Sequence, residues 1–259
     1  MRIILNIICV CLLLATYGCG TNIEQKINEA EATLQSATDS AEVILNGITS
    51  IDNPKDFQKA KCCLLISEAK LKQGKSFLMV DGFDDALDYY EASRDTSALL
   101  DMYQLAAIKM RWLGCQDSAS IFLRKAIDIA SNVTTPTKSE LLIELSNLYA
   151  MPSLKKNYTK AVSHAMEALK VSHTKEERSR ALHDIGLFYS FIGHNDSTAI
   201  YMEPAFNEID TDNPLFTTFA LNYVNNPSSY FKRRMAYLYL IQTPNLGKLI
   251  IWRFLIRKH

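Results

Sequence analysis

The amino-acid sequence predicts an all-α protein, and three observations lead to that prediction. A pattern seen in residues 182–205, two amphipathic helices joined at a turn glycine, recurs along the chain. Gly and Pro, the two poorest helix formers, number only 9 and 7 among 259 residues. Between residues 23 and 212 no segment alternates apolar and polar side chains as a half-buried strand does.

The clearest unit occupies residues 182–205. Gly186 permits close contact between two helices, and Gly193 makes the turn between them. Small and apolar side chains at i, i+4 and i+7 then form one face of the second helix. The residues that define this frame are Leu182, Ile185, Gly186, Tyr189, Gly193, Thr198, Met202 and Ala205.

The same frame recurs toward the N-terminus with varying regularity. Residues 103–126 repeat it closely around Gly114, residues 142–168 carry a short insertion near Pro152, and residues 63–93 carry a longer one. At the N-terminus only a second helix is recognisable, around Ala41, Leu45 and Ile48. The small residues that begin the packing faces of the second helices are Ala41, Ala86, Ala119, Ala161 and Thr198.

These offsets resemble the tetratricopeptide repeat (TPR), a helix-turn-helix unit with a period near 34 residues, and the resemblance covers roughly residues 23–212. It implies an α-solenoid, a right-handed superhelical array of about five TPR-like units over residues 27–226. The chain departs from the pattern in three respects: no Trp opens a unit, Lys70 occupies a position where Tyr is expected, and the helix-ending Pro is absent from its usual position. An irregular helical bundle with the same apolar periodicity is the alternative.

A short phrase precedes three of the second helices: Asp39-Ser40-Ala41, Asp117-Ser118-Ala119 and Asp196-Ser197-Thr198. Asp or Ser at a helix start accepts a hydrogen bond from a free backbone N–H, and the negative charge suits the positive end of the helix. We therefore expect these residues to cap helices. The alternative is that they resemble an O-glycosylation acceptor used on exported proteins by some bacteria.

The N-terminal residues predict export. Arg2 precedes an apolar run from Ile3 to Ala15 that is too short to span a bilayer, as in a signal peptide over residues 1–19. Cys19 follows a Gly and resembles the lipidated Cys of a bacterial lipoprotein, although Thr16 and Tyr17 depart from the usual box. Residues 20–26 would form a tether, and Gly20 favours the outer membrane with the protein facing the periplasm.

The C-terminal residues differ in kind from the repeats. Residues 213–223 have the pattern of a further first helix. Beyond Asp212, the last acidic residue, seven basic residues follow, and two apolar runs separated by polar residues are each too short to span a membrane. We interpret residues 227–259 as a basic and apolar tail, either disordered or the product of a disrupted reading frame in a longer family. Binding to anionic lipid is the alternative.

The sequence offers no arrangement typical of catalysis. The five His are scattered, no Gly-rich phosphate loop is present, and adjacent Cys62 and Cys63 point about 100° apart on a helix, which is unsuited to a metal clamp. We expect Cys62, Cys63 and Cys115 to be buried apolar residues, with a disulfide to Cys115 as the alternative. Basic residues of the repeats are balanced by acids, which argues against nucleic-acid binding. We expect no enzyme activity, no cofactor, no metal and no small-molecule substrate.

The function predicted is an exported, lipid-anchored TPR scaffold that binds a protein or peptide partner on its concave face. Two alternatives remain: the sensory half of a TPR-containing bacterial transcriptional regulator, and an outer-membrane protein assembly factor. In TPR families the ligand face is formed by positions 2, 5, 9 and 12 of each first helix, and Arg side chains there can clamp carboxylates. The resemblance assigns these positions to Asp101, Gln104, Ile108, Arg111, Glu140, Ile143, Asn147, Ala150, Arg180, His183, Leu187 and Ser190.

Overall fold

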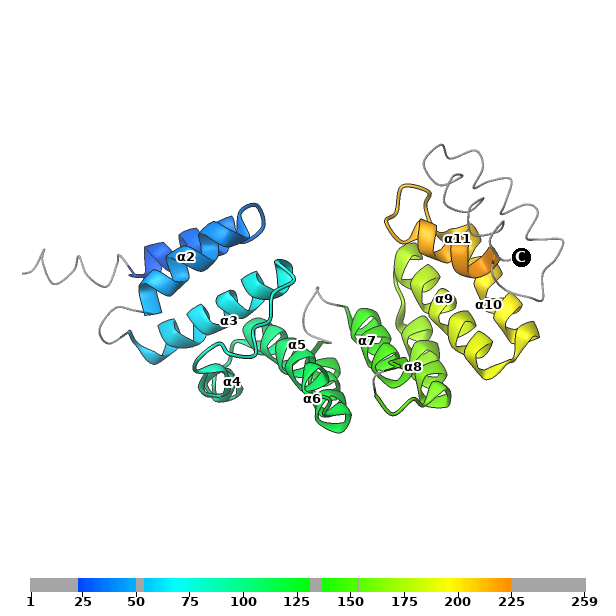
Figure 1. The fold of residues 1–259 in the computed structure, drawn as a ribbon, viewed down its shortest axis with the longest axis horizontal. Coiled ribbons are helices and arrows are strands. Elements are labelled where there is room, and N and C mark those ends of the chain that lie inside the picture. The colour runs from blue at the N-terminus through cyan, green and yellow to red at the C-terminus, as the bar shows by residue number, and fades with distance from the viewer. Residues whose placement is uncertain (1–22, 50–53, 131–136, 153, 225–259) are drawn as a thin grey trace, which may run out of the picture. The chain divides into compact units, whose positions relative to one another are not determined.

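Every regular element in the described part of the chain is a helix. A computed structural model describes residues 23–49, 54–130, 137–152 and 154–224 and contains no strand among them (Figure 1). The all-α prediction is confirmed. The signal segment with Cys19 and the tail beyond residue 224 lie outside the described residues.

The chain divides into two compact units, residues 1–112 and 113–259. In the first, helical residues 23–33 precede α2 (Thr38–Thr49), α3 (Asp56–Lys72), α4 (Phe83–Ala92) and α5 (Thr96–Trp112). The second contains α6 (Gln116–Ile129), α7 (Lys138–Ala150), α8 (Tyr158–Val171), α9 (Lys175–Ile192), α10 (Asn195–Glu208) and α11 (Phe216–Val224). Consecutive helices within each unit pack against each other, as stacked helix pairs do.

The second-helix positions chosen from the sequence lie at the helix contacts. All five small residues are buried, with exposed fractions of 3% or less: Ala41, Ala86, Ala119, Ala161 and Thr198. The predicted turn glycines Gly114 and Gly193 have φ of 76° and 88°, a left-handed conformation that other residues rarely adopt, and Gly74, just after α3, has φ of 67°. The helix-turn-helix frame drawn from residue spacing is therefore confirmed for α9 and α10, which pack against each other.

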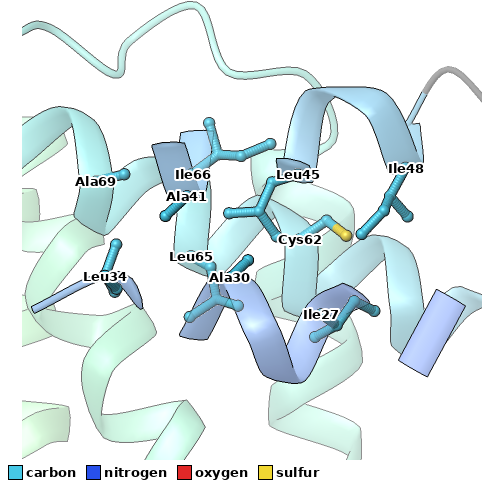
Figure 2. Close-up of a cluster of buried hydrophobic side chains, with 10 residues drawn as sticks. All are labelled: Ile27, Ala30, Leu34, Ala41, Leu45, Ile48, Cys62, Leu65, Ile66 and Ala69. Carbon is cyan, nitrogen blue, oxygen red and sulfur yellow. The ribbon is translucent and has the colours of Figure 1, made fainter. Parts of the chain in front are cut away.

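The N-terminal core shows a helix that spacing alone did not reveal. Ile27, Ala30 and Leu34 pack from residues 23–34 into one cluster with side chains of α2 and α3 (Figure 2). Residues 23–26, which the sequence analysis assigned to a tether, are helical. The cluster is completed by Ala41, Leu45, Ile48, Cys62, Leu65, Ile66 and Ala69.

The Asp-Ser phrases lie in the first turns of α2, α6 and α10, and those of α6 and α10 do not cap their helices. Cys115 and His194 occupy the N-cap positions of α6 and α10, and neither side chain forms a capping hydrogen bond. Asp117 and Asp196 lie one residue inside the first turn, where their charge still suits the helix dipole. The predicted capping hydrogen bond is therefore wrong for these two helices, because each N-cap lies two residues before the Asp of the phrase.

Candidate partner-binding surface

In the first unit, the accessible residues of α5 include a stripe along one side of the helix. Its buried residues, among them Leu100, Met102, Tyr103, Leu105, Ala106 and Ala107, cover most of its circumference. The four predicted partner-binding residues are all half-buried and lie at i, i+3, i+7 and i+10, along one side of the helix: Asp101, Gln104, Ile108 and Arg111. Within the described residues no hydrogen bond or ion pair engages Gln104 or Arg111.

A carboxylate of α3 that the sequence analysis missed belongs to this face. Burial, and then the charge of Asp101, raises the pKa of Glu68 to about 7. Burial also raises the pKa of Asp101, which Lys61 partly offsets. Glu68 occupies position 9 of the first helix in its unit. The sequence analysis assigned partner-binding residues only in the three later units, and the same assignment in the unit of α3 would have included Glu68. The charge of Asp101 on α5 therefore affects the pKa of Glu68 on α3, and both carboxyl groups lie on the face where a partner is expected.

In the second unit the predicted residues fall into two groups. Glu140, Asn147, Arg180, Leu187 and Ser190 are half-buried, like their counterparts on α5. Some of them already have structural roles: the Glu140 carboxylate accepts from the backbone N–H of Thr137, and Ser190 Oγ donates to the carbonyl of Leu187. No hydrogen bond or ion pair within the described residues involves Arg180. Arg180 therefore remains available to a partner in the same way as Arg111.

Two of the predicted residues, Ile143 and His183, are buried, with exposed fractions of 1% and 5%. The His183 ring stacks on Phe219 of α11 with ring centroids 3.9 Å apart and an interplanar angle of 2°. The Asn222 amide donates to His183 Nε2 over 2.9 Å. Helix α11 therefore covers the position that spacing assigned to a groove, and neither side chain lines an open face.

His183 also belongs to a chain of polar contacts between three first helices. His183 Nδ1 donates to Asp184 Oδ1 over 2.9 Å, and the Asn147 amide donates to Asp184 Oδ2 over 3.2 Å. Because Asp184 is 7% exposed, an unpaired carboxylate there would be costly. The contacts with Asn147 and Asn222 join α7, α9 and α11, so this network holds the helices in register.

Other kinds of site were sought in the described part of the chain. No group of three or more His, Cys, Asp or Glu there could hold a metal ion. No described helix is long and apolar enough to cross a membrane. Cys62, Cys63 and Cys115 are free; burial raises the pKa of both Cys62 and Cys63 to about 11, whereas Cys115 is exposed, which corrects its predicted burial.

Comparisons with known proteins agree with this architecture. No family model and no curated protein matches the sequence. Among solved structures, a STAND protein with a tetratricopeptide repeat sensor from Pyrococcus horikoshii superposes with a TM-score of 0.69 at 15% identity, over 88% of this chain and 37% of that one. The chain thus spans little more than a third of that protein.

Two further solved structures have shorter chains. A putative kinesin light chain with nearly identical TPR-like repeats from Podosopora anserina gives a TM-score of 0.57 at 13% identity, over 72% of this chain and 94% of that one. A Rap protein complexed with competence and sporulation factor gives a TM-score of 0.51 at 15% identity, over 88% of this chain and 66% of that one. At these identities the likeness concerns the fold, and the fold of this chain is a TPR-like α-solenoid.

Proposed function

We propose that this chain is an exported, lipid-anchored scaffold that binds a protein or peptide segment along the first helices of its repeats. The observation that carries the proposal is the stripe on α5. Asp101, Gln104, Ile108 and Arg111 are half-buried along one side of a helix whose buried residues lie on its other sides. A stripe that combines charge, amide and apolar surface suits a peptide, which offers the same mixture.

The charges on the stripe indicate which side chains of a partner would bind at each end. Arg111, at the end of α5, has a planar guanidinium that can hold a carboxylate through two hydrogen bonds. Arg180 of α9 offers the same group on the second unit. At the other end of the α5 stripe, Glu68 and Asp101 would favour a basic side chain. The Rap structure, complexed with competence and sporulation factor, supports ligand binding by a repeat array of this fold.

Export and anchoring rest on the N-terminal sequence. Arg2, the apolar run and the Gly-Cys pair at Cys19 support a lipoprotein of the outer membrane. Several acyl chains on Cys19, each CH₂ contributing about 0.8 kcal/mol, would anchor the protein stably.

A photo-crosslinking experiment tests the partner-binding face. A photoreactive phenylalanine analogue at Gln104 should crosslink a partner in intact cells, and the crosslink should fall by about tenfold when Arg111 is replaced by Ala. The matched control places the analogue at Val43, which is 72% exposed on α2. Equal crosslinking from Val43, or a Gln104 crosslink indifferent to Arg111→Ala, would exclude the α5 stripe.

The sensory half of a larger regulator is a second candidate. The repeats of the Pyrococcus horikoshii neighbour are described as a sensor, and this chain spans 37% of that protein. A reading frame encoding a membrane helix and a DNA-binding domain directly downstream of this gene would support it. Unrelated genes downstream would argue for the free scaffold.

A further inference from the structure

A second hollow surface lies in the first unit, formed by other residues than the α5 stripe. Residues of α2, α3, α4 and the loop before α4 enclose a groove of about 980 Å³. This volume lies at the upper end of the range for ligand pockets, about 300 to 1,000 Å³. Apolar, acidic and basic side chains all line the groove, and they are not evenly distributed around it.

The long insertion between α3 and α4 forms one wall of this groove. Phe77 anchors the loop: its side chain is 1% exposed and its ring lies 6.0 Å from Phe83 and 5.0 Å from Trp112. The backbone N–H of Val80 donates to the Phe77 carbonyl and closes a turn. Met79, held at the edge of the groove by this turn, is 91% exposed.

The groove combines an apolar interior with an acidic wall. Ala60, Cys63 and Ile66 of α3 line its floor but are at most 5% exposed, so the accessible apolar surface comes mainly from Val80, Tyr89 and Met79. Asp85 and Asp88 lie three residues apart on one side of α4, and Asp81 lies in the turn just before the helix. A ligand in the groove would meet both surfaces at once.

The acidic wall has no counter-charge of its own. Lys70 pairs with Glu42 at 2.8 Å, and Lys59 pairs with Asp56 at 3.4 Å, so both basic groove residues are engaged. Asp84 pairs with Lys109 on another side of α4. Asp81, Asp85 and Asp88 make no ion pair within the described residues. The uncompensated charge of the groove is therefore negative, on one wall only.

We propose that this groove binds an amphipathic segment of a partner protein, with basic side chains along one edge and apolar side chains along the other. Basic side chains on one edge of the bound segment would face Asp85 and Asp88 on α4 and Asp81 in the turn before it. The apolar edge would contact Met79, Val80 and the exposed part of Tyr89. The site goes beyond the proposed function, since none of the partner-binding residues on α5, α7 or α9 lines it.

The test uses the full chain and a fluorescein-labelled peptide of about fourteen residues, built from Leu and Lys at amphipathic helical spacing. Fluorescence anisotropy should show saturable binding that weakens with salt. The triple variant Asp81→Asn, Asp85→Asn, Asp88→Asn should weaken binding by about tenfold, since each exposed ion pair contributes modestly. Met79→Ala should weaken it by about threefold through lost apolar contact.

A charge-matched control variant separates the groove from general attraction. It carries Asp128→Asn, Glu167→Gln and Asp212→Asn, three exposed acidic residues of the second unit. It should bind the peptide within about twofold of the unchanged protein. Equal weakening by the control and the groove variant, or no weakening by either, would overturn the proposal.

A second peptide, taken from this chain's own sequence, tests whether the groove binds a partner or the chain itself. A peptide of residues 229–243 contains Lys232, Arg233 and Arg234 followed by the apolar run to Ile241. Binding of the Leu-Lys peptide alone supports a groove for basic amphipathic segments of a partner. Binding of both peptides supports it as well, provided that the triple variant weakens both by the same factor. Binding by the 229–243 peptide alone would overturn the assignment to a partner and give the groove to this chain's own sequence.

Discussion

At the scale of single residues, the closeness of helix contacts decides which side chains are tolerated. Gly186 lies where α9 meets α10: a Cβ there would be 2.6 Å from Met202 Cγ and 3.1 Å from the Met202 backbone nitrogen. A side-chain terminus could move aside, but the backbone of α10 could not. The two helices therefore require a residue without a side chain at this position.

Gly186→Leu should lower the free energy of unfolding by about 1 to 3 kcal/mol, because the added carbons force α9 and α10 apart. Gly47→Ala in α2 is the matched control, since a Cβ at that position would have no neighbouring atom within 4 Å. In an open helical position the same kind of change should stabilise by about 0.5 to 1 kcal/mol. Urea denaturation of both variants measures the contrast; a neutral Gly186→Leu would show that the contact can relax.

The second residue-scale prediction concerns Glu68. Its pKa of about 7 in the folded chain, against an ordinary 4.5, means that the folded state holds a proton there which the unfolded state has lost. Stability should therefore fall as the pH rises from about 5 to 8. Glu68→Gln should remove about 1 to 2 kcal/mol of this fall, a figure reduced for partial solvent exposure.

Urea denaturation at pH 5 and pH 8 measures the effect. Asp128→Asn, at an exposed position of α6, should leave the pH profile of the protein unchanged. If the Glu68→Gln variant loses as much stability between pH 5 and pH 8 as the unchanged protein does, another group is responsible for the pH dependence of stability.

At the scale of elements, helices begin in two different ways. Thr174 Oγ1 accepts from the backbone N–H of Glu177 over 3.1 Å, and the Glu177 carboxylate accepts in return from Thr174 N–H, so α9 starts with a full capping box. The N-cap residue of α6 is Cys115, whose side chain provides no capping bond. Both helices follow three-residue links, so the difference lies in the N-cap residue itself: Thr174 carries a hydroxyl oxygen that accepts a backbone N–H, and Cys115 does not.

Thr174→Ala should therefore cost about 1 kcal/mol, the usual contribution of a lost N-cap bond. Cys115→Ala should change stability by less than about 0.5 kcal/mol, since it removes an exposed side chain that forms no cap. Thermal denaturation followed by circular dichroism compares the two. Equal effects would mean that the capping box of α9 adds nothing to stability.

At the scale of the whole molecule, the proposed lipid anchor can be tested separately from the repeats. The proposal makes membrane association depend on Cys19. Cys19→Ala should transfer the protein from the membrane fraction to the soluble periplasmic fraction, because the acyl chains supply the affinity. Fractionation after export measures this. Retention of the variant on membranes would move the anchor to the basic and apolar tail.

The sequence by itself determined the helical units and their contact positions. Ala119, Ala161 and Thr198 were assigned to helix contacts from spacing, because a period near 3.6 fixes which side chains share a face. Gly114 and Gly193 were assigned to turns, because only glycine adopts their φ without strain. These are local properties, and each can be read from about ten neighbouring residues.

The tertiary structure alone decided which faces stay open. His183 and Ile143 have the spacing of groove residues but are buried, since α11 covers His183 through Phe219 and helix crossing decides which side of α7 is covered. Helical residues 23–33 carry only a short apolar pattern, whose role is defined by its contact with Cys62 and Leu65 of α3. Periodicity defines the face of a helix, but packing between helices distant in sequence determines whether that face meets solvent.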